Sequence, residues 1–205
     1  MKHLIFLPGA SGNTAFWQPL MALLPAGYSM QVIAYPEFGD APAHPDVSDF
    51  ASLSRHVLGQ IEQESIIIAQ SMGGIFAVQA ALQKPELVKG LVLIATSGGI
   101  DLSRFEIEDW RTAYKNQFLN YPDWFTAVQL DYSAQLPDIQ QKVLLLWGDA
   151  DPVSPVAVGQ HLKQLFADSS LQIIPGGDHL FAQQHAPETA ARISEYLQHF
   201  AQRAH

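Results

Sequence analysis

Six short and almost wholly apolar runs recur along this chain, and longer amphipathic segments separate them. The runs are Leu4 to Leu7, Met30 to Tyr35, Ile66 to Ala69, Leu91 to Ala95, Val143 to Trp147 and Leu171 to Ile174. Continuous runs rich in Ile, Val and Leu are typical of strands that are covered on both faces in a parallel sheet. We therefore expect an α/β fold, with a mostly parallel sheet of about six strands between two layers of helices.

The segments between these runs show the three- and four-residue spacing of helices with one apolar face. Two such faces consist of Phe50, Leu53, Val57 and Ile61, and of Ala190, Ile193, Leu197 and Phe200. Right-handed crossovers join parallel strands almost without exception, so the loops that leave the carboxyl ends of the strands lie along one edge of the sheet. We expect the functional residues at that edge.

The composition excludes several classes of protein. The chain has 205 residues, a formal net charge of -9 and no cysteine. A negative surface repels the phosphates of nucleic acids and anionic lipids, and the lack of thiols excludes a disulfide framework and a thiolate metal site. The apolar run near Met1 is too short for a signal-peptide core or a membrane span. We expect one cytoplasmic domain over residues 1–205 that binds neither nucleic acid nor membrane.

Residues 98–141 contain no predicted strand and interrupt the alternation of strands and helices. A helical stripe of aromatic and apolar side chains crosses this insertion, formed by Ile107, Trp110, Tyr114 and Phe118. Long insertions in compact domains are frequently lids or binding elements, which predicts that Trp110, Tyr114 and Phe118 contact the apolar part of a substrate. The alternative is that the stripe only packs the insertion against the body.

A strand, a sharp turn and a helix are predicted around Ser71. The strand Ile66 to Ala69 ends just before this serine, and a helical segment follows it. Small residues lie two positions before the serine and two positions after it, Ala69 and Gly73, as a tight turn between a strand and a helix requires. Such a turn presents a serine as a nucleophile, although a serine that only caps a buried helix gives a similar pattern.

A serine nucleophile needs a base and an acid at the same edge of the sheet. Among 8 histidines, His179 follows the strand Leu171 to Ile174 through a short glycine-containing loop. Two acids, Asp149 and Asp151, follow the preceding strand. Residue order and strand position thus favour His179 as the base and leave both aspartates open as its partner.

These three motifs resemble those of the α/β hydrolases. That family uses the chain order Ser, Asp, His, and its acid usually follows a glycine by three positions, which here selects Asp151 over Asp149. The nucleophile motif departs from the family pattern, with Ala69 where G-x-S-x-G has its first glycine. The resemblance runs from His3 to about Phe200 and implies a core that lacks the family's first two strands, with the first and third strands of this chain as neighbours.

The resemblance also implies an oxyanion hole formed by two backbone N–H groups. One belongs to Met72, directly after the nucleophile, and the other to Ala10, in the turn after the first strand. The family commonly has His-Gly at this turn, whereas this chain has Pro8-Gly9. The change alters hydrogen bonding around the turn without removing the Ala10 N–H.

The resulting hypothesis is a serine hydrolase that cleaves a small ester, lactone or thioester through an acyl-enzyme. The same three side chains also serve carbon-carbon bond hydrolysis, elimination and acyl transfer, and a protein that only binds a ligand is a third alternative. Three cations of the insertion, Arg104, Arg111 and Lys115, either hold a substrate carboxylate or are solvated. No phosphate-binding loop with its lysine and no H-E-x-x-H motif is present, so we expect neither a cofactor nor a metal.

Overall fold

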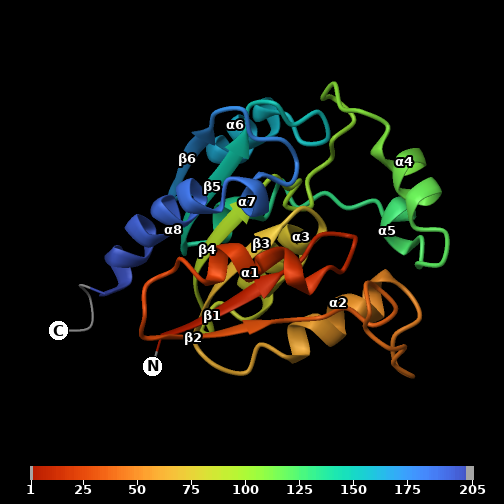
Figure 1. Cartoon of the computed structure of the whole chain (residues 1–205), viewed down its shortest axis with the longest axis horizontal. Coiled ribbons are helices and arrows are strands. Elements are labelled where there is room, and N and C mark those ends of the chain that lie inside the picture. Colours follow the sequence, from red (N-terminus) through yellow and green to blue (C-terminus); the bar gives the residue numbers. More distant parts are fainter. Residues whose placement is uncertain (1, 202–205) are drawn as a thin grey trace.

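The computed structural model describes residues 2–201, and in it the six predicted strands form one sheet whose neighbouring strands are all parallel. The strands are β1 (Lys2–Leu7), β2 (Tyr28–Val32), β3 (Ser65–Gln70), β4 (Val88–Ile94), β5 (Lys142–Gly148) and β6 (Ser169–Ile174). Their order across the sheet is β2-β1-β3-β4-β5-β6 (Figure 1). The predicted α/β class and the pairing of β1 with β3 are confirmed.

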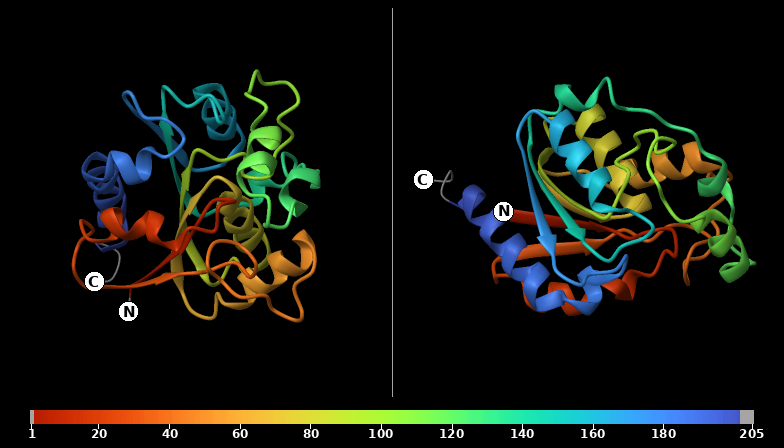
Figure 2. Two further views of the ribbon diagram at one scale, coloured as in Figure 1. Left: turned by 45° about the vertical axis from the view of Figure 1, so that its right-hand side comes forward. Right: turned by 90° about the horizontal axis from the view of Figure 1, so that it is seen from above.

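Helices cover both faces of the sheet (Figure 2). One face carries η1 (Thr14–Trp17), α1 (Gln18–Met21), α7 (Phe181–Gln184) and α8 (Ala186–Ala201). The opposite face carries α2 (Phe50–Gly59), α3 (Met72–Gln83) and α6 (Val156–Leu165). Helices α1, α2, α3 and α6 belong to the connections between consecutive strands, whereas α7 and α8 follow β6.

Alternation of side chains along the strands explains why the apolar runs are continuous. In β3, Ile66 and Ile68 join the cluster that contains Trp17 and Ile193 of the α8 face. Ile67, which lies between them, faces the opposite way and joins the cluster formed with α2 and α3. Every residue of β3 is therefore buried, which explains a continuous apolar run rather than an alternating one.

The sequence prediction is wrong about the second strand, which spans Tyr28–Val32 rather than Met30 to Tyr35. Its partner β1 ends at Leu7, and the last backbone hydrogen bond between the two segments runs from Ile33 N–H to Phe6 O. Beyond that point the chain leaves the sheet. Tyr35 is fully buried, and its side chain reaches the loop after β1 instead of extending the strand.

The insertion, residues 98–141, contains no strand and holds α4 (Trp110–Gln117), α5 (Trp124–Ala127) and η2 (Leu136–Asp138). In Figure 1, α4 and α5 (green) lie at the side of the body above α2. The predicted helical stripe is wrong at Ile107, because the Asp109 carboxylate accepts the Thr112 N–H at 3.2 Å and so begins the helix at Trp110.

Within residues 2–201, no helix combines the length and the apolar character that crossing a bilayer requires.

Candidate active site

Ser71 occupies the turn between β3 and α3 in a backbone conformation that L-residues rarely adopt. Its φ is 51° and its ψ is -120°. Such a conformation costs on the order of 1–3 kcal/mol, so the surroundings must hold it. The Ser71 N–H donates to Ile94 O at 3.0 Å, and the Ser71 carbonyl accepts the Gly74 N–H at 3.0 Å and the Thr96 hydroxyl at 2.5 Å. The Ser71 hydroxyl makes no capping hydrogen bond to α3.

Two glycines let the turn approach its neighbours. A methyl group on Gly73 would collide with the carbonyl oxygens of Leu7 and Pro8, and one on Gly74 would collide with the Thr96 side chain. All three obstacles are fixed, because two of them are backbone atoms and the third is a buried threonine. The small residues after the serine thus allow the first turn of α3 to contact the end of β1 and the loop after β4.

The structure brings Ser71, His179 and Asp151 together at the carboxyl edge of the sheet. His179 Nε2 lies 3.1 Å from Ser71 Oγ, and His179 Nδ1 lies 2.8 Å from Asp151 Oδ2. With a proton on Nδ1 donated to the carboxylate, Nε2 is free to accept the serine proton. The three side chains come from the loops after β3, β5 and β6, remote in the sequence and adjacent in the fold.

The Asp151 carboxylate is completely buried, and both of its oxygens accept hydrogen bonds. Its side chain has no exposed area, and its second oxygen accepts the N–H groups of Val153 at 2.8 Å and Ser154 at 2.9 Å. These donors keep the carboxylate fixed while Oδ2 faces the imidazole. The other candidate acid, Asp149, is exposed and accepts the Gly176 N–H at 2.6 Å, so it links the loops after β5 and β6 and does not contact the histidine.

Gln70 holds the histidine loop from the side of the serine, a role that the sequence analysis missed. Its Nε2 donates to the His179 carbonyl at 3.2 Å, and its side chain lies against Gly9 of the loop after β1. It is 4% exposed, so its amide acts inside the protein. A polar residue at the end of an apolar strand, directly before the serine, was the available signal. The sequence analysis also missed Thr96, whose hydroxyl donates to the Ser71 carbonyl.

The loop after β1 passes beside the nucleophile. A methyl group on Gly9 would lie 3.3 Å from Ser71 Cβ. Among the described residues, no acceptor is assigned to the N–H of Ala10 or to that of Met72, the first residue of α3. The role of these two N–H groups as oxyanion donors stays a prediction.

The three predicted substrate contacts of the insertion lie in an aromatic network that joins the insertion to the body. Trp110 stacks on Phe125 with ring centroids 4.9 Å apart, and Phe118 packs against Tyr114 at 5.0 Å. Tyr114 is 8% exposed, and its hydroxyl donates to the Ala10 carbonyl at 3.0 Å. Packing of the stripe on the body, the alternative reading of the sequence, accounts for these contacts, and contact with substrate stays a prediction.

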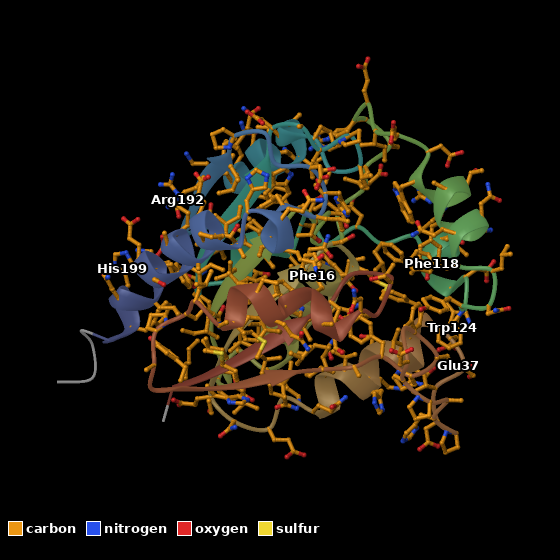
Figure 3. The ribbon with its side chains drawn as sticks, in the orientation of Figure 1. Phe16, Glu37, Phe118, Trp124, Arg192 and His199 are labelled. Atoms are coloured by element: carbon orange, nitrogen blue, oxygen red, sulfur yellow. The ribbon has the colours of Figure 1, made fainter. Side chains whose placement is uncertain are left out.

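The edge of this network reaches the loop after β2. Figure 3 shows Trp124 next to the segment that carries Glu37, and the Trp124 ring lies 6.0 Å from the ring of Phe38.

The cations of the insertion have local partners. Arg104 contacts His161, Arg111 lies over the Trp110 ring at 4.5 Å, and Lys115 pairs with Asp123 at 3.5 Å.

Comparisons with known proteins agree with this architecture. The model of the alpha/beta hydrolase family matches residues 4–192. The pimeloyl-[acyl-carrier protein] methyl ester esterase of Shewanella woodyi is 25% identical over 249 residues, covering 97% of this chain and 95% of the relative. The esterase of the same name from Photobacterium profundum is 24% identical, with 96% and 94% covered.

Among solved structures, a thermophilic esterase from Thermogutta terrifontis superposes with a TM-score of 0.77 at 18% identity, over 97% of this chain and 90% of that one. This likeness shows a shared fold. The aligned stretch in the Shewanella relative is longer than the present chain of 205 residues. Because the family model spans nearly all of the sequence, the chain belongs to the alpha/beta hydrolase family.

Proposed function

We propose that this protein hydrolyses carboxylic esters through an acyl-enzyme formed on Ser71. The observation that carries the proposal is the hydrogen-bonded series Asp151, His179, Ser71, with distances of 2.8 Å and 3.1 Å. The names of the curated relatives, which are methyl ester esterases, support the same reaction. A protein that only bound a ligand would need neither the strained serine nor the buried carboxylate behind the histidine.

In the first half of the reaction, Ser71 Oγ attacks the ester carbonyl carbon while His179 Nε2 takes the hydroxyl proton. The electron pair of the carbonyl double bond moves to its oxygen. When the tetrahedral intermediate collapses, the bond to the alcohol oxygen breaks and that oxygen takes the proton from Nε2. Asp151 stabilises the imidazolium through Nδ1–H and is never itself protonated.

In the second half, a water molecule takes the role of nucleophile that the serine hydroxyl had in the first. His179 Nε2 accepts its proton as the water oxygen attacks the acyl-enzyme, and the proton then returns to Ser71 as the carboxylic acid leaves. In both halves, the N–H groups of Ala10 and Met72 stabilise the negative oxygen. A preorganised donor of this kind contributes roughly 3 kcal/mol of barrier lowering.

For the substrate, we infer a small ester, lactone or thioester with an apolar acyl part. The relatives act by name on the methyl ester of a pimeloyl group on acyl-carrier protein, which is an ester of a small alcohol. The aromatic insertion supports an apolar acyl part, and we keep Trp110 and Phe118 as its proposed contacts. The pattern of bonds at Ser71 offers no reason to prefer carbon-carbon hydrolysis, elimination or acyl transfer.

The test is active-site labelling with a fluorophosphonate probe. We expect one label on the peptide that contains Ser71, by mass spectrometry, and hydrolysis of p-nitrophenyl acetate. Ser71→Ala should abolish the label and lower kcat by at least about 1000-fold. Ser97→Ala, a matched change in the loop after the neighbouring strand, should keep both. A folded wild-type protein that takes no label, or takes it elsewhere, would overturn the proposal.

A further inference from the structure

Three consecutive carbonyl groups of the loop after β1 are each held by a different donor. Pro8 O accepts the Tyr35 hydroxyl at 2.8 Å, and Gly9 O accepts the Gly12 N–H at 3.0 Å. The third, Ala10 O, accepts the Tyr114 hydroxyl at 3.0 Å. Of these three bonds, only the middle one is made within the loop. Two remote tyrosines therefore hold the peptide planes that carry the other two carbonyls.

This pattern determines where the Ala10 N–H points. The Gly9 carbonyl and the Ala10 N–H belong to one planar peptide unit and point in opposite directions. When Gly12 binds the carbonyl, the N–H is directed away from the turn. The next peptide unit carries the Ala10 carbonyl, and the Tyr114 hydroxyl restrains its rotation. Residue 10 is thus held on both sides, while no acceptor for its N–H occurs among the described residues.

The two tyrosines differ in origin. Tyr35 follows β2 and is fully buried in the body, whereas Tyr114 lies in α4 of the insertion and is 8% exposed. Burial raises the pKa of the Tyr114 phenol above its usual range, so the hydroxyl stays protonated and keeps donating. Its ring is held by Phe118, with centroids 5.0 Å apart. The insertion therefore reaches the loop with a fixed donor.

We propose that Tyr114 is a positioning residue for ester hydrolysis, which acts by fixing the Ala10 carbonyl and with it the N–H that stabilises the oxyanion. The inference rests on the proposed function. It replaces the sequence-based expectation that Tyr114 contacts the substrate, because its hydroxyl is directed at the protein backbone. The insertion then contributes to the active site through the Tyr114 hydroxyl.

A positioning role and a substrate contact predict different kinetics. Loosening the oxyanion donor weakens binding of the transition state and leaves the ground state almost unchanged, so it lowers kcat equally for every ester. Loss of a substrate contact would raise KM, and more so for longer acyl chains. Loss of packing alone would lower the melting temperature without lowering the rate of each folded molecule.

The experiment compares Tyr114→Phe with the wild type and with Tyr121→Phe as the matched control. Tyr121 belongs to the same aromatic network, and no hydrogen bond of its hydroxyl occurs among residues 2–201. Rates on p-nitrophenyl acetate and hexanoate are divided by the concentration of sites titrated with the fluorophosphonate probe, so unfolded molecules do not count. Affinity for a trifluoromethyl ketone, which forms a tetrahedral adduct with a serine, is measured in parallel.

For Tyr114→Phe we expect kcat to fall about 10-fold on both esters, with KM within about 2-fold. Affinity for the trifluoromethyl ketone should fall by a similar factor, and Tyr121→Phe should change neither quantity. An unchanged kcat per titrated site, or a change confined to KM of the longer ester, overturns the proposal for Tyr114 alone. A wild-type protein that takes no label at Ser71 overturns the proposed function instead.

Discussion

The two sides of the candidate active site are held by different means. On the side of the acid and base, the loops after β5 and β6 bond to each other: Asp149 accepts the Gly176 N–H, and Ala150 N–H donates to Gly177 O at 3.0 Å. On the other side, the loop after β1 depends on the hydroxyls of Tyr35 and Tyr114, which come from remote segments. The first side is held mainly by bonds between its own loops, with Gln70 and the Glu108 N–H, which donates to Pro152 O at 3.0 Å, as contacts from outside. The second side depends on two remote hydroxyl groups.

This difference predicts which substitutions should act locally and which at a distance. The loops after β5 and β6 should tolerate side-chain changes in the insertion, because the bond from Glu108 N–H to Pro152 O joins backbone atoms and none of the hydrogen bonds that orient His179 comes from the insertion. The loop after β1 should respond to the insertion and to the first turn of α3, which packs directly against it. Three further substitutions test this division.

The largest effect is expected at the acid. Asp151→Asn should lower kcat by about 1000- to 10,000-fold, because an amide favours the wrong tautomer of His179. Asp149→Asn is the matched control, and its kcat should fall less than about 10-fold, since an amide oxygen can still accept the Gly176 N–H. Steady-state kinetics on p-nitrophenyl acetate measure both. An equal or greater loss at Asp149 would reverse the assignment of the acid.

A smaller effect, on both stability and rate, is expected at Gly73. The methyl group of Gly73→Ala would meet the carbonyl oxygens of Leu7 and Pro8, so α3 and the loop after β1 must separate. We expect a loss of about 1–3 kcal/mol in the free energy of unfolding and a lower kcat. Urea denaturation gives the first quantity and ester hydrolysis the second.

The matched control is Gly59→Ala at the end of α2, where an added methyl group meets no atom within 4 Å. This variant should be as stable as the wild type or more stable, because alanine favours helix over glycine. If both alanines had the same effect on stability, the close approach at Gly73 would not matter to the fold.

The smallest effect is expected at Phe118, the proposed contact for the acyl chain. Phe118→Ala should raise KM for p-nitrophenyl hexanoate by roughly 5-fold relative to acetate, as loss of about 1 kcal/mol of apolar contact predicts. Its neighbour Leu119, which is 82% exposed, provides the control variant Leu119→Ala with no such preference. Equal changes in KM for both esters would assign Phe118 to packing alone.

The sequence predicts the sheet well because buried parallel strands carry a continuous apolar signal. All six runs contribute to strands, although the second does so only as far as Val32, and the carboxyl edge brings Ser71, Asp151 and His179 together. Asp151 could be preferred over Asp149 only through the family's spacing. Nothing in the local pattern of the two carboxylates distinguishes one that faces a histidine from one that binds a backbone N–H.

The insertion is less predictable, because its aromatic residues have the same spacing whether they face a substrate or the body. The helix begins at Trp110 rather than at Ile107, since a side-chain cap decides the boundary. The bond from Tyr114 to Ala10 joins positions 104 residues apart, and no periodicity reports such a pairing. Roles of this kind depend on tertiary contacts, which a single sequence does not display.

The distance along the chain between the serine and its base has a consequence for biosynthesis. His179 lies 108 positions after Ser71 and follows β6, the sixth strand of the sheet in chain order. A growing polypeptide that has emerged only as far as β5 therefore contains the nucleophile without its proton acceptor. The proposed ester hydrolysis would therefore begin only once the segment that carries β6 and His179 has been made and the strand has docked at the sheet margin.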